Sequence, residues 1–150
     1  MELTGKTQFK QPVDIIWEAL HDPEILKHVI PGCQKLELIG ENEYEVVMKL
    51  GVAAVKGEYV GKVKLEDIEK PYHYVFNAEG NGSPGHVKAT MNCKLVPTEK
   101  GCVLEWDCQA EVGGMIASVG SRVLSGIAKY MAGKFFKDIE KKSAEKVVTI

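Results

Sequence analysis

A glycine-rich segment over residues 80–85 carries the glycine spacing of the dinucleotide-binding fingerprint, with glycines at positions 80, 82 and 85. That fingerprint binds a pyrophosphate only where the glycine turn leads from a strand into a helix, whose N-terminus then holds the phosphates. Here the turn leads into His86-Val87-Lys88-Ala89-Thr90-Met91, which alternates polar and apolar residues as a strand does. The segment therefore predicts a hairpin loop and no nucleotide site.

The histidines could serve as general acids, general bases or metal ligands, but their spacing favours none of these roles. No two of them have the spacing of an HExxH helix or of another compact metal site. His21 and Asp22 are adjacent and could act as an acid–base pair, but Asp22 is better explained as the cap of a helix that begins at Pro23. We therefore predict no catalytic residue, no metal site and no cofactor.

The cysteines also lack the spacing of a metal site. No CxxC pair occurs among them, so neither a zinc site nor a disulfide framework is supported. Free cysteine is often buried, and we expect buried thiols in a cytoplasmic protein. The residues concerned are Cys33, Cys93, Cys102 and Cys108.

Charge and composition exclude two classes of function. The net charge is -2, and Arg122 is the only arginine among 19 basic residues. Nucleic-acid readers rely on arginine for bidentate contacts to bases and phosphates, so we predict no nucleic-acid partner. No run approaches the roughly 20 apolar residues of a membrane-spanning helix, and we expect at most peripheral contact with the inner face of a membrane.

The hydrophobic pattern predicts the elements that would position any site. Leu3–Lys10 alternates like a strand, and two short helices follow, the first opened by Pro12 and the second capped by Asp22. From Gln34 to Val112 the period is two, with turns that divide the stretch into six more strands. A long helix then runs from about Met115 to beyond Lys141. This order predicts a single α+β domain over residues 1–150, with the helix-grip fold: a curved seven-stranded antiparallel sheet wrapped around the C-terminal helix.

The last helix has an unusual composition for one that covers a sheet. Gly120 and Gly126 fall within it, although each glycine costs about 1 kcal/mol in a helix interior. Gly57 and Gly61 lie on the apolar parity of their strand and remove bulk from the same interior. We interpret the helix as the slim wall of an apolar cavity. Its expected inner stripe is Ile116, Val119, Val123, Ile127, Tyr130 and Met131. After Gly133 the apolar residues Phe135, Phe136 and Ile139 rotate off this stripe, so either the helix bends there or its end packs against a different neighbour, such as the first short helices.

The expected lining of this cavity combines that stripe with inward positions of the sheet and of the first helix. Flexible methionines at such positions can repack around a guest molecule, although an apolar stripe is also what a filled core looks like. The predicted ligand-binding residues are Trp17, Tyr59, Phe76, Met91, Trp106, Val119, Val123, Ile127 and Met131.

A set of short motifs occurs in an order that resembles a known family. The motifs are Asp22-Pro23-Glu24 through Ile30-Pro31-Gly32-Cys33, Lys49-Leu50-Gly51-Val52, residues 55–61, residues 80–85 with Val87-Lys88, Val112-Gly113-Gly114 and Gly120-Ser121-Arg122. Together they resemble the carbon monoxide dehydrogenase G-subunit family of the Bet v 1-like, START-related (SRPBCC) superfamily. Members of that superfamily bind lipids, sterols, quinones or aromatic metabolites in an apolar cavity, and some are enzymes.

The resemblance implies an accessory role beside a molybdenum-containing dehydrogenase and brings no catalytic residues with it. Longer members of the family continue into a tail that can reach a membrane, whereas this sequence ends at Ile150. Two functions are left open: a non-enzymatic carrier of a lipid, fatty acid or quinone, and a cyclase-like or hydrolase-like enzyme that acts on an aromatic or lipid substrate in the same cavity. An outer helix face with Arg122, Lys129 and Lys137 is the predicted docking surface for an acidic partner or a membrane.

Overall fold

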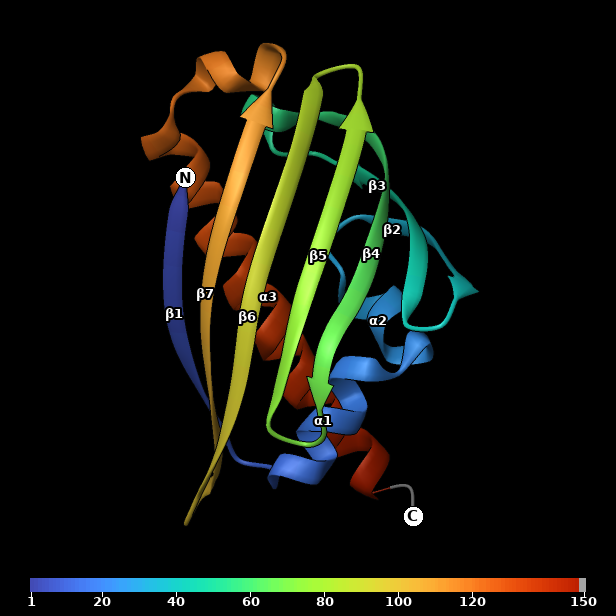
Figure 1. Cartoon of the computed structure of the whole chain (residues 1–150), viewed down its shortest axis with the longest axis vertical. Helices are drawn as coiled ribbons and strands as arrows, with labels where there is room; N and C mark the ends of the chain where they lie inside the picture. The colour runs from blue at the N-terminus through green and yellow to red at the C-terminus, as the bar shows by residue number, and fades with distance from the viewer. Residues whose placement is uncertain (149–150) are drawn as a thin grey trace.

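A curved antiparallel sheet wraps around one long helix in the computed structural model, which describes residues 1–148 and the side chains of residues 1–145 (Figure 1). The seven strands follow the order β1-β7-β6-β5-β4-β3-β2, so every pair except β1–β7 joins neighbours in sequence. This arrangement confirms the predicted helix-grip fold. The elements are β1 (Glu2–Phe9), α1 (Val13–His21), α2 (Pro23–Val29), β2 (Cys33–Gly40), β3 (Glu43–Leu50), β4 (Gly57–Glu69), β5 (His73–Gly82), β6 (Gly85–Thr98), β7 (Gly101–Gly113) and α3 (Ser121–Val148), with single 3₁₀ turns η1 (Ala53–Val55) and η2 (Met115–Val119).

The two short helices close one end of the sheet, and local signals fix where they begin. Asp22 caps α2, because its Oδ1 accepts a hydrogen bond of 2.9 Å from the backbone N–H of Glu24, and Pro23 occupies the first helical position. The predicted cap is therefore confirmed. Ile16, Trp17 and Leu20 of α1 turn into the core beneath the sheet.

The C-terminal segment departs from the expected single helix. Residues Met115–Val119 form the 3₁₀ turn η2, and Gly120 adopts a φ of 96°, a left-handed value that favours glycine. The α-helix begins only at Ser121 and continues to Val148. Gly120 is thus a break before the helix and not a glycine inside it.

The inner face of α3 also differs from the expected stripe. The helix turns Leu124, Phe136 and Ile139 into the core, with Ala128 and Ala132 partly buried between them. Val123 and Tyr130 are 49% and 67% exposed, so these two positions of the predicted stripe are wrong. The error arose because Ile116 and Val119, which set the phase of that stripe, belong to η2 rather than to the α-helix.

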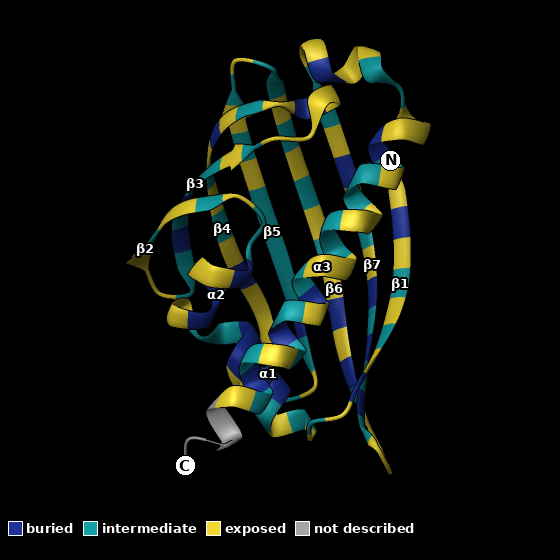
Figure 2. Ribbon diagram, turned by 180° about the vertical axis from the view of Figure 1, so that it is seen from behind, coloured by how far each residue is buried: buried dark blue, intermediate teal, exposed yellow. Residues whose placement is uncertain are grey.

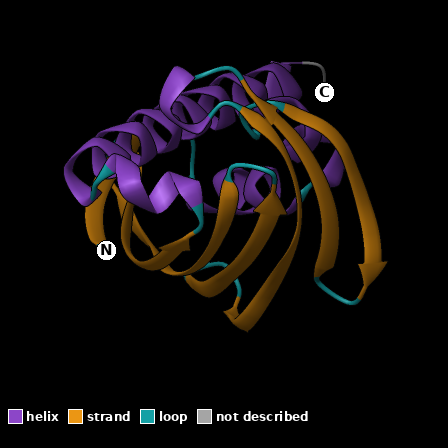
Figure 3. Cartoon of the chain, turned by 90° about the horizontal axis from the view of Figure 1, so that it is seen from above, coloured by secondary structure: helices purple, strands orange, loops and turns teal. Residues whose placement is uncertain are grey.

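The second half of α3 packs against the short helices. Its backbone lies close to α1 and α2, and Phe136 meets Phe9 of β1 edge to face with ring centroids 6.4 Å apart. Phe135, Phe136 and Ile139 therefore leave the predicted stripe because this end of the helix packs against the short helices, which is one of the two alternatives that the sequence left open. Figure 3 shows the strands curving beneath the helices, which leaves a concave face between them.

Candidate functional site

The concave face between the sheet and α3 holds two separate groups of buried apolar side chains. The larger group fills the end with α1 and α2, and includes Phe9, Trp17 and Phe136. The smaller group lies at the other end of the sheet and consists of Val55, Ile116 and Leu124. Figure 2 shows this division as buried residues gathered around α1 and a smaller set near the opposite end. The region between the groups is the candidate site.

Small residues form the floor of this region across four adjacent strands. We define the small-residue band as two neighbouring rows of inward positions in which cross-strand pairing brings alanines and glycines together. One row joins β5, β6 and β7, and the other joins β4 and β5. The band consists of Ala78, Ala89 and Ala110 in the first row and of Gly61 and Gly80 in the second.

The two glycines of the band differ in what surrounds them. A Cβ on Gly61 would lie against the backbone carbonyl of Glu79, so this glycine allows two strands to approach closely. A Cβ on Gly80 would meet no heavy atom within 4 Å. Because Gly80 lies on the inward parity of β5, this open volume is on the concave side of the sheet.

Apolar side chains surround the band without being fully buried. Phe76 of β5 pairs with Met91 of β6, which in turn pairs with Cys108 of β7. All three point inward and pack on the larger core group, yet solvent still reaches them. A completely filled core would bury such positions, so their partial exposure indicates unfilled apolar space. Met48 and Val63 complete this rim.

The other wall of the concave face is α3, which crosses behind the sheet (Figure 1). Ala128 and Ala132 face the sheet there, and Ile127 and Met131 flank them with intermediate burial. The inner face of α3 therefore carries small side chains, as the sequence suggested, but these are the two alanines and not the glycines. Gly126 is exposed on the outer side of the helix, where a Cβ would meet nothing within 4 Å.

The predicted lining residues divide into three groups in the structure. Phe76 and Met91 lie together at the rim of the band, and Ile127, Met131 and Val119 are partly buried on the side of α3 and η2. Trp17, Tyr59 and Trp106 are buried in packed surroundings. Val123 lies outside the concave face altogether, which corrects its assignment as a lining residue.

The buried aromatic residues have partners that define their roles. Trp17 stacks on His21 with ring centroids 4.2 Å apart and meets Tyr74 edge to face at 5.4 Å. The indole of Trp106 lies over Gly5, where an added Cβ would come within 2.5 Å of its ring. The Tyr59 hydroxyl donates a 2.6 Å hydrogen bond to the carbonyl of Val55.

The polar groups of the interior favour neutral forms. Burial raises the pKa of the Cys93 thiol to about 12, although its hydrogen bond with Tyr74 opposes the shift. Burial likewise raises the pKa of Tyr74 well above its usual value. For His21, burial lowers the pKa below 6.5. Its Nδ1–H donates to the carbonyl of Trp17 at 2.8 Å, while Nε2 is buried and has no partner in the described part of the chain.

The remaining motifs of the sequence take structural places. The glycine-rich segment forms the β5–β6 hairpin, with Gly82 paired to Gly85, and so it leads from strand to strand as predicted. Within residues 1–148, no three His, Cys, Asp or Glu side chains are arranged to hold a metal ion. Over the same residues, no helix combines the length and hydropathy needed to cross a bilayer.

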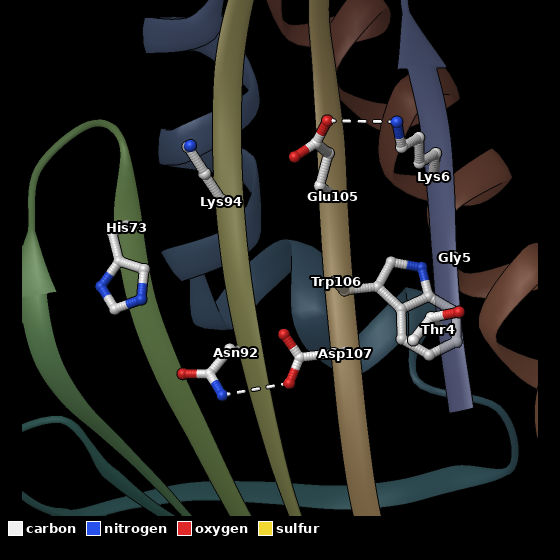
Figure 4. Close-up of a pocket in the computed structure, with 9 residues that line it drawn as sticks. All are labelled: Thr4, Gly5, Lys6, His73, Asn92, Lys94, Glu105, Trp106 and Asp107. Carbon is white, nitrogen blue, oxygen red and sulfur yellow. Dashed lines mark hydrogen bonds and ion pairs between the residues drawn. The ribbon is translucent and has the colours of Figure 1, made fainter. Parts of the chain in front are cut away.

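An open depression of about 550 Å³ lies on the outer face of the sheet, across β1, β7, β6 and β5 (Figure 4). Its polar side chains are largely paired with one another. Lys6 forms an ion pair of 3.4 Å with Glu105, and Asn92 donates a 3.2 Å hydrogen bond to Asp107. Among the described residues that line this open, solvent-facing surface, Trp106 is the one large apolar side chain, whereas apolar side chains from several strands surround the band on the concave face, which favours the concave face for an apolar ligand.

The small-residue band is what sequence reasoning missed. Ala78, Ala89 and Ala110 each occupy an inward position, which the alternation of each strand could show, but alanine alone gives no signal of a cavity. Only the strand register places them side by side. The sequence signal that could have revealed them is their spacing: the alanines of two neighbouring strands lie at equal distances from the hairpin turn that joins those strands.

Comparison with known proteins agrees with this architecture. A structure described as a conserved protein from Geobacillus kaustophilus shares 41% identity and a TM-score of 0.94, covering 97% of this chain and 96% of its own. A START superfamily protein from Mycobacterium smegmatis has a TM-score of 0.75 at 11% identity, with 96% and 97% of the two chains covered. Ara h 8.0201 has a TM-score of 0.73 at 16% identity, with 97% and 98% covered.

The family comparison extends the structural one. No curated protein matches the chain in sequence. The family model of CoxG, the carbon monoxide dehydrogenase G-subunit, matches residues 5–144, which is nearly the whole chain. The strand order, the long C-terminal helix and this match agree with the motifs of the sequence, and the chain belongs to the CoxG family.

Proposed function

We propose that this protein is a non-enzymatic carrier that holds an elongated apolar molecule between the sheet and α3. The observation that carries the proposal is the small-residue band on the concave face of the sheet, with open space above Gly80 and half-buried apolar side chains around it. A lipid, a fatty acid or a quinone fits this space because its binding depends more on buried apolar area than on polar contacts. Each Å² of apolar area that is buried contributes about 25 cal/mol to the free energy of binding. Phe76, Met91, Ile127 and Met131 are the side chains we assign to the ligand.

The polar groups of the interior support a carrier over an enzyme. The Tyr59 hydroxyl is bonded to the carbonyl of Val55, and the Tyr74 hydroxyl is in contact with Cys93. Both groups are held neutral, and within residues 1–145 neither forms a pair with a buried carboxylate. A cyclase or hydrolase would need at least one positioned acid or base facing the substrate. His21 is the group closest to this requirement, because its Nε2 is buried and unpartnered among the described residues.

Membership of the family supports an accessory role beside an enzyme. We propose that the carrier serves a molybdenum-containing dehydrogenase of the carbon monoxide dehydrogenase type, in the cytoplasm or at the inner face of the membrane. The exchange of a quinone or lipid with such an enzyme would require an exposed docking surface. Arg122, Lys129 and Lys137 are exposed on α3, and they remain our predicted contact residues for an acidic partner or a membrane.

The experiment that tests the carrier is native mass spectrometry of the purified protein, before and after incubation with oleate or with a short-tailed quinone. We expect the wild-type protein to retain or take up one apolar molecule. Gly80→Leu places a side chain into the open space above the band and so removes volume from the ligand, and we expect the affinity to fall by about tenfold or more, which is about 1.4 kcal/mol of binding. The matched control is Gly126→Leu, which adds the same side chain at an equally open position on the outside of α3.

Two results would contradict the proposal. The first is a wild-type protein that neither co-purifies with an apolar molecule nor takes one up. The second is equal uptake by Gly80→Leu and Gly126→Leu, which would place the ligand elsewhere. Turnover of the added molecule, abolished in His21→Asn, would instead favour the enzyme.

A further inference from the structure

Exposed apolar residues gather at the end of the molecule where three loops meet. The loops are η1 between β3 and β4, the β5–β6 hairpin, and η2 before α3, and Figure 1 shows them together at the top of the sheet. Met115 of η2 is 76% exposed and Val52 before η1 is 38% exposed. Ala53, Ala54 and Ala117 are exposed beside them. We call this set, with the start of α3 described below, the loop end.

The loop end is a built structure rather than a collection of loose turns. Beneath its exposed side chains, Val55, Ile116 and Leu124 form the smaller buried group. The N–H of Ile116 donates a 2.9 Å hydrogen bond to the carbonyl of Pro84, which ties η2 to the β5–β6 hairpin. A Cβ on Gly114 would come within 2.7 Å of the Gly85 backbone, so these loops are packed closely. The exposed residues are therefore held outward by the residues buried below them.

The first turns of α3 continue the same surface. Val123 and Tyr130 are seven positions apart and form an exposed apolar edge on the outer side of the helix. Arg122 and Lys129 form a parallel basic edge next to it. Gly126 lies between the two edges, so no bulky side chain separates them. Apolar and cationic groups thus face the same way.

The charge of this end differs from that of the whole chain. The chain has a net charge of -2, yet residues 112–137 contain no Asp or Glu and include Arg122 and three lysines. Residues 46–57 and 80–98 also lack carboxylates. Of the lysines in these segments, Lys134 is paired with Asp138 at 3.2 Å, and Lys49 and Lys88 lie directly opposite Glu58 and Glu111 in the strand register. Arg122, Lys129 and Lys56 form no ion pair within residues 1–145, so the loop end presents these three cations without a carboxylate partner.

We propose that the loop end docks on a bilayer that contains anionic phospholipids. Exposed Met, Val and Ala side chains enter the interface, while Arg122, Lys129 and Lys56 face the phosphates. A protein partner fits less well, because protein interfaces are depleted in lysine, and lysine supplies most of the cations here. The inference rests on the proposed carrier function, since it names the surface through which an apolar ligand would be exchanged.

The test is co-sedimentation with vesicles of phosphatidylcholine alone and of phosphatidylcholine mixed with phosphatidylglycerol. We expect the wild-type protein to bind the mixed vesicles, to bind the neutral vesicles weakly, and to be released by salt. Arg122→Glu should weaken binding at least about fivefold, and Met115→Asp should weaken it by a similar factor.

Matched controls lie away from the loop end. Leu38→Asp changes an apolar residue that is 63% exposed, and Lys100→Glu reverses an exposed cation in the β6–β7 turn. Both should bind vesicles like the wild type. Thermal unfolding of every variant, followed by circular dichroism, verifies that the fold is intact.

The outcomes separate this inference from the carrier proposal. Three results would overturn the inference. The wild-type protein could fail to bind vesicles, it could bind neutral and anionic vesicles equally, or all four variants could lose binding to the same extent. Binding of an acidic protein through Arg122 without any vesicle binding would also overturn it. In each case, ligand uptake measured by native mass spectrometry without vesicles still reports on the carrier by itself.

Discussion

At the scale of single residues, Gly5 is required by the indole that covers it. A Cβ at this position would lie 2.5 Å from the Trp106 ring, and Trp106 is itself packed beside Phe136. We expect Gly5→Ala to lower the free energy of unfolding by about 1–3 kcal/mol, as overpacked cores do. Urea denaturation measures the change. Gly80→Ala is the control, because its Cβ meets open space; a similar loss in both variants would contradict the geometry.

His21 should make the stability depend on pH in the acid range. Burial holds its folded-state pKa below the usual 6.5, so the unfolded chain binds the proton more tightly than the folded one. The stabilising contribution is fully present above pH 6.5 and is lost as the pH falls through the lower folded-state value. His21→Asn keeps a donor for the Trp17 carbonyl and does not titrate. We expect a smaller decrease of the urea midpoint in this variant between about pH 7 and pH 5; identical decreases would contradict the assignment.

Cys108 provides a probe of the concave face. It lies beside Met91 in the register of the sheet and is partly exposed, whereas Cys93 and Cys102 are buried. Burial raises the pKa values of these two to about 12 and about 11, which keeps them as unreactive thiols near neutral pH. We expect a thiol reagent to modify Cys33 and Cys108 first, as mass spectrometry of labelled peptides would show. Added oleate should protect Cys108 and leave Cys33 unchanged, and protection of neither would argue against a ligand on this face.

At the scale of elements, the two glycines of the C-terminal segment have opposite roles. Gly120 has a φ of 96° and separates η2 from α3, so alanine there is strained. Gly126 lies inside α3 with open surroundings, so alanine there gains helix propensity. We expect Gly120→Ala to destabilise the protein by about 1 kcal/mol or more and Gly126→Ala to stabilise it by up to about 1 kcal/mol. Thermal unfolding of the two variants decides this, and a shift of equal sign in both would refute it.

These glycines also show where sequence reasoning was limited. Hydrophobic periodicity treats residues 115–131 as one helix, because a 3₁₀ turn and an α-helix have similar apolar spacing over a few residues. The phase taken from Ile116 and Val119 then turned Val123 inward and left Phe136 off the predicted stripe. Gly120, which separates η2 from α3, does not change the hydrophobic pattern, because its φ is known only from the structure.

At the scale of the whole molecule, the fold could be predicted from the sequence because the same strand and turn patterns recur along the chain. Period-two alternation from Gln34 to Val112, with turns between the strands, gave six strands, and the cap at Asp22 gave the second short helix. The candidate site was predictable only in part. Phe76 and Met91 were found from parity, but the band of Ala78, Ala89 and Ala110 depends on how strands from different parts of the chain pair.

The division of the core into two buried groups has a consequence for how the protein opens. The smaller group of three residues ties η1, η2 and the start of α3 together, and only partly buried side chains connect it to the larger group. Amide hydrogens at this end should therefore exchange with solvent by a local opening that costs less than global unfolding. The β1, β7 and α1 amides around Phe9 and Leu104 should exchange only with the whole molecule. A guest could then enter and leave while most of the sheet stays folded.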